Sequence, residues 1–344
     1  MRRRYVRGLC VWMAMLLLTL GLSACGSAQT EKETESLGIE TEEKEEGKSL
    51  KIIAVMFPEY DWLREILGER LEEVELEMLL DSGIDVHSYE PSLEDILEIS
   101  SCDLFVYAGG ESSEWVDEVL KQSQNPQRKV LSLLELLGSE AKEEEYVEGM
   151  ERTEEHEAHE GEEEESEYDE HVWLSLRNAE RFTQSIADTL GELDEENAEY
   201  YQSRQEAYRQ KLADLDERYQ MVVEAAPQKT LIFGDRFPFR YLTEDYGLSY
   251  YAAFAGCSTE INASFETIVF LADKMKELEI SKILTIEKSD EKIAKTVLET
   301  ANLSEAEILT LDSLQSVNQK EIEEGKTYLS TMEENLEVLQ KALQ

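Results

Sequence analysis

Short apolar runs alternate with amphipathic stretches in two separate parts of the chain, and this pattern predicts the fold. In the first part, runs of strand length are separated by helix-like segments such as SSEWVDEVLKQ; these runs are LKIIAVMF, VELEMLL, DLFVYAGG and KVLSLLELL. The second part repeats the alternation with KTLIFG, LSYYAAF, KILTIE and EILTLD. Strands that alternate with helices are typical of parallel sheets covered by helices on both faces. We therefore expect an α/β fold with two lobes, each built on a four-stranded parallel sheet.

One long helix is predicted to join the lobes, over residues 193–227. No Gly or Pro interrupts the stretch before Pro227, and Tyr201, Tyr208 and Leu212 recur near helical spacing. Such a length is typical of a dimerising coiled-coil arm or of a rigid helix lying along the body. The second reading is favoured because another alternating unit follows. The lobes are then expected at 50–192 and 228–344, with a closing helix from about Ile322 to Leu343.

The N-terminal segment predicts export and anchoring. Four arginines precede an apolar stretch that ends in LSAC-G, so residues 1–24 have the features of a signal peptide. LSAC-G also resembles a bacterial lipobox, in which Cys25 would carry the lipid; plain secretion is the alternative. Residues 25–49 are polar and acidic and predict a flexible tether. The expected location is the extracytoplasmic face of the cell membrane, through a lipid anchor.

The chain is strongly acidic, with a formal net charge of −45. This charge argues against nucleic acid as a partner, because phosphates would be repelled. Part of it lies in a run at about 139–170 that contains His156 and His159 and ends beside His171. A run of carboxylates cannot bury apolar surface, so we expect a disordered loop. Its histidines are interpreted as accessory cation-binding groups, or as incidental members of a solvated linker.

Two histidines are predicted to converge on one site. His87 follows the second predicted strand, and His171 follows the fourth, at the point where the acidic run changes to the apolar VWL. Carboxyl ends of parallel strands meet at one edge of a sheet, and ligands of open α/β sheets bind there. A metal site in the cleft between the lobes is the hypothesis that follows.

At these residues the chain resembles a known family. GIDVHSYEPSLEDI and DEHVWLSLRNA are similar to the two histidine motifs of the zinc- and manganese-binding receptors of bacterial ABC importers. RYLTEDYGL, SFETI and the closing YLSTMEENLEVLQKAL also fit, so the resemblance runs from about residue 50 to the end. It implies the metal-receptor type of periplasmic-binding-protein fold and a monomeric, lipid-anchored lipoprotein that is not an enzyme. Its function would be to capture Zn²⁺ between the lobes and deliver it to an ABC permease.

The resemblance also implies a ligand set. His87 and His171 would be metal ligands, with Tyr89 and Glu90 packing against or orienting His87. The family's third ligand, a His or Glu, falls on Arg236 here, which has no free lone pair. Asp235 is the expected substitute, and Glu287 or Asp290 is expected to supply the fourth ligand. Histidines with carboxylates suit zinc and also manganese, and the histidine-bearing acidic loop favours zinc.

Several alternatives remain open at this point. One is a manganese receptor of the same family, and another is a surface adhesin or sensor whose metal is structural. A third is an anchored metallohydrolase, although the chain contains no HExxH motif. Cys102 and Cys257 would form a disulfide or remain free thiols, and sequence separation does not decide between these states.

Overall fold

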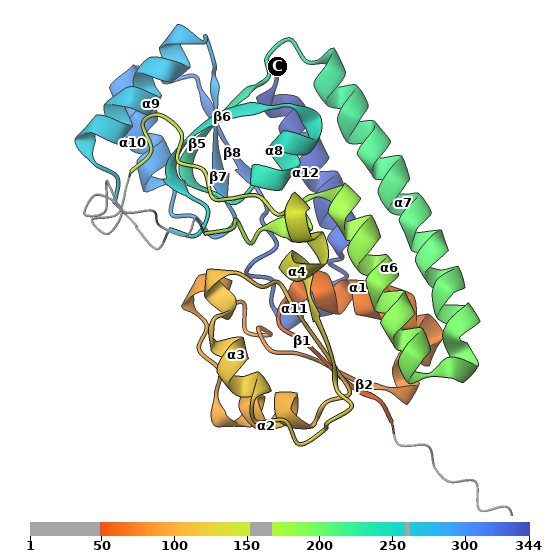
Figure 1. Ribbon diagram of the computed structural model, residues 1–344. Coiled ribbons are helices and arrows are strands. Elements are labelled where there is room, and N and C mark those ends of the chain that lie inside the picture. The colour runs from red at the N-terminus through yellow and green to blue at the C-terminus, as the bar shows by residue number, and fades with distance from the viewer. Residues whose placement is uncertain (1–48, 152–166, 259–261) are drawn as a thin grey trace, which may run out of the picture. The chain divides into compact units, whose positions relative to one another are not determined.

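The computed structural model describes residues 49–151, 167–258 and 262–344 (Figure 1). Within them the chain forms two four-stranded sheets, and every strand pairing is parallel. The strand orders are β2-β1-β3-β4 and β6-β5-β7-β8. The predicted class, two parallel four-stranded lobes joined by a long helix, is confirmed.

The first lobe begins at residue 51 and follows the predicted alternation closely. Its elements are β1 Lys51–Ala54, α1 Phe57–Leu67, η1 Gly68–Glu73, β2 Glu75–Met78, η2 Val86–Ser88, α2 Leu93–Ser101, β3 Leu104–Tyr107, η3 Glu111–Ser113, α3 Trp115–Leu120, β4 Lys129–Ser132, α4 Leu133–Leu137 and η4 Gly138–Glu140. The prediction that KVLSLLELL is one strand is wrong in its second half, which is helical. Ser132 caps this helix, since its hydroxyl accepts a hydrogen bond from the backbone N–H of Glu135.

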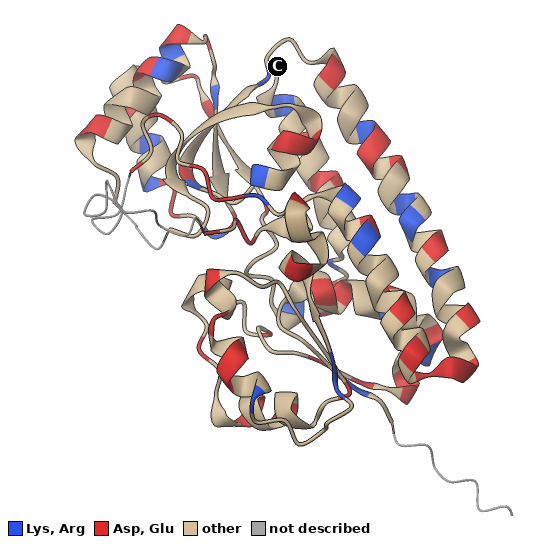
Figure 2. Cartoon of the chain, in the orientation of Figure 1, with Lys and Arg blue, Asp and Glu red and all other residues tan. Residues whose placement is uncertain are grey.

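Two packed helices connect the lobes (Figure 1). The connecting elements are η5 Val172–Leu174, α6 Leu176–Leu193, η6 Glu195–Asn197 and α7 Ala198–Ala225. One stripe of α7 is buried, and it includes Tyr201, Tyr208, Leu212, Leu215 and Tyr219. The remaining faces are charged, as the alternating red and blue bands along this helix show (Figure 2). This pattern is typical of a helix that lies along a globular body.

The second lobe contains the remaining elements. They are β5 Thr230–Phe237, α8 Arg240–Tyr246, β6 Ser249–Ala255, α9 Phe265–Glu277, β7 Lys282–Ile286, α10 Lys292–Ala301, β8 Glu307–Leu311, α11 Gln319–Glu323 and α12 Tyr328–Ala342. Two differences from prediction occur. The predicted strand run KTLIFG ends at Gly234, whereas β5 continues through Asp235 and Arg236. The closing helix is interrupted at Gly325, whose φ of 99° is one that glycine adopts readily.

The buried core is continuous across both lobes. One cluster of buried apolar residues extends from the first sheet through α6 and α7 to one face of the second sheet and α12. A smaller cluster lies between the other face of the second sheet and α9 and α10. Within the ranges given above, no helix is both long and apolar enough to cross a membrane.

The chain crosses between the lobes at more than one point. Residues 142–151 belong to the first half of the sequence but contact the second lobe, where the N–H of Glu151 donates to the carbonyl of Ala253. The hydroxyl of Tyr241 donates to the carbonyl of Asp169, so the segment before η5 contacts α8. The helix α12 returns to the first lobe, because the N–H of Tyr328 donates to Asp61 on α1.

Candidate metal centre

His87 is held by the short helix that follows β2. Asp85 caps this helix, and its Oδ1 accepts a hydrogen bond of 3.1 Å from the backbone N–H of His87. The imidazole is nearly buried, with 5% of the side chain exposed. The loop therefore fixes the backbone of His87 and directs its ring into the protein.

His171 is fixed on both its backbone and its ring. Asp169 Oδ1 accepts a hydrogen bond of 2.9 Å from the N–H of His171 and lies 3.0 Å from its Nδ1. The ring is fully buried and packs beside Trp173, with ring centroids 5.3 Å apart. A carboxylate on one ring nitrogen orients a histidine so that the other nitrogen is free to bind a metal. Here that free nitrogen is Nε2.

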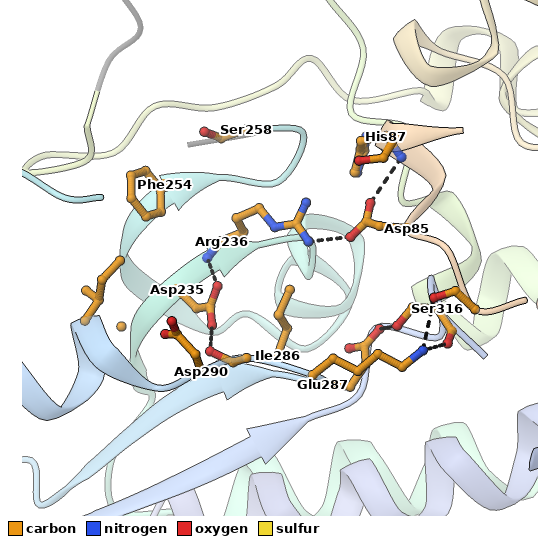
Figure 3. Close-up of a pocket in the computed structure, with 16 residues that line it drawn as sticks. Asp85, His87, Asp235, Arg236, Phe254, Ser258, Ile286, Glu287, Asp290 and Ser316 are labelled. Carbon is orange, nitrogen blue, oxygen red and sulfur yellow. Dashed lines mark hydrogen bonds and ion pairs between the residues drawn. The ribbon is translucent and has the colours of Figure 1, made fainter. Parts of the chain in front are cut away.

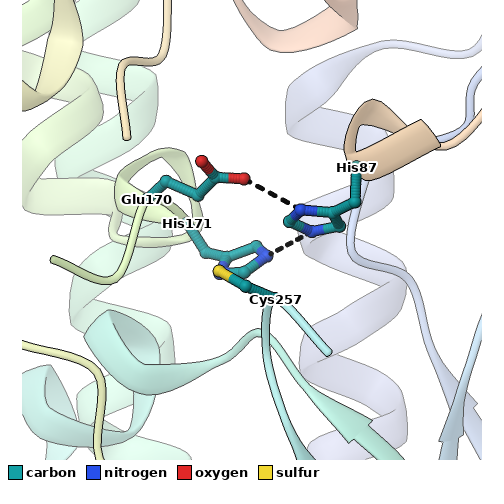
Figure 4. Close-up of side chains that lie close together, drawn as sticks. All are labelled: His87, Glu170, His171 and Cys257. Carbon is teal, nitrogen blue, oxygen red and sulfur yellow. Dashed lines mark hydrogen bonds and ion pairs between the residues drawn. The ribbon is translucent and has the colours of Figure 1, made fainter. Parts of the chain in front are cut away.

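The free nitrogens of the two histidines face each other (Figure 4). Nε2 of His87 lies 3.3 Å from Nε2 of His171. Tetrahedral zinc with Zn–N bonds of about 2.0–2.1 Å places neighbouring ligand atoms roughly 3.3 Å apart. The pair therefore already has the spacing that one zinc ion requires.

Glu170 and Cys257 complete the cluster. Donor atoms of His87, Glu170, His171 and Cys257 all lie within 4.8 Å of one another. Glu170 Oε1 is 3.1 Å from Nδ1 of His87, and its Oε2 accepts a hydrogen bond from the N–H of Ser112. Cys257 comes from the loop after β6, so the second lobe supplies a thiol to a site that otherwise belongs to the first half of the chain.

Gly256 allows this approach of the two lobes. A Cβ at this position would lie 2.8 Å from Cε1 of His171, which is closer than side chains tolerate. The backbone that carries Cys257 can therefore lie against the imidazole only because residue 256 has no side chain.

Charges around the cluster favour a cation. Burial raises the pKa of Glu170, but the hydrogen bond and charge of His87 outweigh this effect and hold that pKa below its ordinary value. Burial lowers the pKa of His171, but the charge and hydrogen bond of Asp169 have the larger effect and hold this pKa above its ordinary value. Burial, together with Glu170 and Glu144, raises the pKa of the Cys257 thiol well above its ordinary value.

The three predicted carboxylates lie outside this cluster. Glu287 follows β7, but its oxygens accept hydrogen bonds from the N–H and hydroxyl of Ser313. Asp235 accepts hydrogen bonds from the N–H of Arg236 and the hydroxyl of Ser289. Asp290 is paired with Lys292 at the start of α10. Only Glu287 directly follows a strand; Asp235 lies within β5 and Asp290 lies just before α10. The oxygens of all three carboxylates contact groups of the second lobe.

Tyr89 and the two cysteines Cys102 and Cys257 also lie within the described residues. Tyr89 does not contact His87 through its hydroxyl, which donates to Asp95 at the start of α2. Cys102 and Cys257 are both free thiols, and Cys102 is buried beside β3. His156 and His159 lie outside the described residues, as does Cys25.

Sequence reasoning did not assign a role to Glu170 or to Cys257 in the cluster. Glu170 stands beside His171 in the DEHVWL motif, and only the fold shows that its side chain points toward His87. Cys257 occupies the carboxyl end of β6, which is the same kind of position that drew attention to His87. That position was the available signal for Cys257.

Known proteins resemble nearly the whole folded part of this chain. The profile of the ZnuA family, described as "Zinc-uptake complex component A periplasmic", matches residues 52–342. The chain is 29% identical to the zinc-binding protein AdcA of Streptococcus pyogenes serotype M6 over 86% of its own length and 56% of AdcA, so it spans about half of that relative. It is also 29% identical to the high-affinity zinc uptake system protein ZnuA of Bacillus subtilis, over 98% of this chain and 97% of that protein.

A solved structure supports the same relationship. The Zn(II)-bound ZnuA-like domain of Streptococcus pneumoniae AdcA superposes with a TM-score of 0.66 at 26% identity, over 86% of this chain and 99% of that one. The resemblance stated from the two histidine motifs is thereby confirmed, and the chain belongs to the ZnuA family of periplasmic zinc-uptake components.

Proposed function

We propose that this protein is an extracytoplasmic receptor that captures Zn²⁺ between its lobes and delivers it to an ABC permease. The observation that carries the proposal is the cluster of His87, His171, Glu170 and Cys257, with the two Nε2 atoms 3.3 Å apart. The relatives named above are described as zinc-binding or zinc-uptake proteins, which supports zinc as the cargo.

In this proposal, His87, His171 and Cys257 are the ligands. Glu170 orients His87 and is near enough to add an oxygen to the coordination shell. Glu287, Asp235 and Asp290 are left out of the set because other groups of the second lobe already engage their oxygens. Thiolate and imidazole suit zinc, whereas manganese prefers carboxylate, carbonyl and water. Cys257 therefore favours zinc over manganese.

The proposal also covers the location and the partners of the protein in the cell. The protein would be anchored through a lipid on Cys25, act as a monomer, bind a membrane permease and perform no catalysis. Relatives of the family include one named as a zinc-binding lipoprotein, which supports the anchor. His156 and His159 would collect cations near the site without forming it.

Metal titration of the tagless mature protein tests the proposal. We expect one tightly bound Zn²⁺ by elemental analysis, and only weak binding of Mn²⁺. Cys257→Ser and His87→Ala should each lower zinc affinity on the order of 100-fold or more, because a four-ligand structural zinc site contributes about 10–16 kcal/mol in total. Full zinc affinity in His87→Ala would overturn the site. A large loss of folding on metal removal would favour an adhesin or sensor with a structural metal.

Deletion of the acidic loop separates the collector from the main site. Removing residues 154–164 leaves Glu151 and Glu167, whose backbone groups pair with Ala253 and Glu144. We expect tight binding of one zinc ion to persist and the additional, weaker binding to disappear in calorimetric titration. Loss of the tight site in this variant would mean that His156 or His159 belongs to it.

A further inference from the structure

The loop that carries His87 is attached to the C-terminal half of the chain as well as to its own lobe. The N–H of Gln319 donates to the carbonyl of Asp81 at 2.8 Å, and Ser82 forms a bridge with Asn318. Further along, Lys288 Nζ donates to the carbonyl of Gly83 at 3.1 Å. The position of this loop therefore depends on where the second lobe lies.

The contact nearest the site is an ion pair between Arg236 and Asp85 (Figure 3). Nη2 of Arg236, on β5, lies 2.5 Å from Oδ2 of Asp85. The other oxygen of the same carboxylate accepts the hydrogen bond from the backbone N–H of His87. A single side chain thus connects the second sheet to the backbone of a ligand.

The pair is better placed than an ordinary surface salt bridge. Its side chains are 17% and 28% exposed, and both line a cavity of about 370 Å³ that His87 also borders. Charge-assisted hydrogen bonds of this length are among the stronger polar contacts in proteins. Burial raises the pKa of Asp85, yet the hydrogen bond and charge of Arg236 outweigh burial and hold it below its ordinary value.

We propose that Arg236 is a positioning residue for the cargo: through Asp85 it holds His87 at the distance from His171 and Cys257 that one zinc ion requires. The inference rests on the proposed function. Arg236 stands where the family resemblance expects a ligand, and in this chain Cys257 provides the donor of the second lobe instead. The arginine then contributes to binding indirectly, by fixing a ligand of the other lobe.

The arrangement couples capture to the relative position of the lobes. A shift of β5 away from the first lobe separates Arg236 from Asp85. The carboxylate that caps the helical turn of His87 then loses one of its two partners. The same shift withdraws Cys257, because β5 and β6 are paired in one sheet. Both effects weaken binding together, which would assist release to a permease.

Five variants, one of them a control, test the role of Arg236. Arg236→Gln and Asp85→Asn each remove the ion pair, and Asp85→Asn keeps an oxygen that can accept from the N–H of His87. The double variant prevents a freed Asp85 carboxylate from contacting the cation itself. Arg218→Ala is the matched control, since Arg218 forms an ion pair of 2.7 Å with Glu333 between α7 and α12. Arg236→Lys keeps the positive charge but lacks the planar guanidinium group, so it tests whether charge alone partly restores the slow dissociation of zinc.

The readouts are the zinc dissociation rate, the melting temperature of the metal-free protein and the spectrum of the Co²⁺ form. We expect dissociation to accelerate about 10- to 100-fold in both single variants, the usual range for contacts that orient a ligand. The double variant should resemble the singles, Arg236→Lys should fall between them and wild type, and Arg218→Ala should match wild type. The thiolate-to-Co²⁺ absorption should persist in every variant.

Two results would overturn the inference. One is unchanged zinc dissociation in Arg236→Gln; the other is additive effects of Arg236→Gln and Asp85→Asn, which would show that the two residues act separately. Absence of tight zinc binding in wild type would instead contradict the proposed function, so the two failures are distinguishable.

Discussion

At the scale of single residues, two adjacent carboxylates support two histidines that are distant in sequence. Asp169 contacts Nδ1 of His171, and Glu170 contacts Nδ1 of His87. Each carboxylate favours the tautomer that carries its proton on Nδ1, which leaves Nε2 with a free lone pair. The short sequence Asp169-Glu170-His171 therefore provides one ligand and the supports of two.

The role of Glu170 can be separated from that of a ligand. Glu170→Gln keeps an oxygen that can accept from Nδ1 of His87, whereas Glu170→Ala keeps none. If Glu170 orients His87, zinc affinity should fall about 10-fold in Glu170→Gln and nearer 100-fold in Glu170→Ala. Isothermal titration with a competing chelator measures both, and Glu111→Gln is the control because this nearby carboxylate is exposed. Equal, large losses in the two Glu170 variants would mean that Glu170 is a direct ligand.

The sequence predicted the histidines but not the rest of the site. His87 and His171 lie in motifs with specific spacing, and both follow strands, so their convergence could be inferred from topology. Cys257 and Glu170 depend on three-dimensional details: the close approach that Gly256 allows and the direction of one side chain. The carboxylates Glu287 and Asp235 were plausible candidates because nothing in the sequence shows that Ser313 and Ser289 occupy their oxygens.

At the scale of elements, α1 begins with a buried acid. Phe57 and Pro58 open the helix, and Glu59 in its first turn is fully buried. Burial raises the pKa of Glu59 from 4.5 to about 8. The folded protein therefore binds this proton more tightly than the unfolded chain does, and folding favours the protonated form.

This acid should make stability depend on pH in a defined window. Because the pKa of Glu59 is higher in the folded protein than in the unfolded chain, its contribution to the free energy of unfolding is complete below about pH 4.5. That contribution is lost as the pH rises toward 8. In Glu59→Gln that loss should disappear, so the variant should gain on the order of 4 kcal/mol relative to wild type between pH 5 and pH 8. Chemical denaturation at both pH values measures the difference. If the free energies of unfolding of the two proteins differed by the same amount at both pH values, the raised pKa would not belong to Glu59.

Helices and strands could be predicted where apolar residues recur with a clear spacing, but the residues at which these elements begin and end could not. The helix α7 was expected because no Gly or Pro interrupts its 28 residues and its tyrosines and leucines recur near helical spacing. In KVLSLLELL the apolar run alone fits a strand or a helix, and the cap at Ser132 decides where one becomes the other. In β5 the pairing of Arg236 with Phe254 of the neighbouring strand extends the strand beyond its apolar run.

At the scale of the whole molecule, the continuous core restricts relative motion of the lobes. Residues of both sheets, α6, α7 and α12 belong to one buried cluster, and Tyr219 on α7 donates a hydrogen bond of 2.6 Å to the carbonyl of Met332 on α12. A hinge opening would have to expose part of this surface to water, at about 25 cal/mol for each Å² of apolar area.

We therefore expect zinc release to involve local shifts and no large hinge rotation. The radius of gyration from small-angle X-ray scattering should be nearly the same for the zinc-loaded protein and for the same sample after chelation. Hydrogen exchange should increase mainly at residues 79–88 and at the loop after β6, which carry His87 and Cys257. A clear expansion of the whole particle on metal removal would contradict this expectation.

The repeated crossings of the chain also determine how the protein can be divided. A fragment that ends before α7 contains both histidines but lacks two contacts beside them. The hydroxyl of Tyr241 would no longer donate to the carbonyl of Asp169. The indole of Trp173 would no longer donate to the carbonyl of Ser313. The second half alone would lack residues 142–151, whose Glu151 caps α9 through Ser264 and Thr267. Either fragment would also expose apolar surface of the shared core, so we expect engineered versions to need residues 50–344 together.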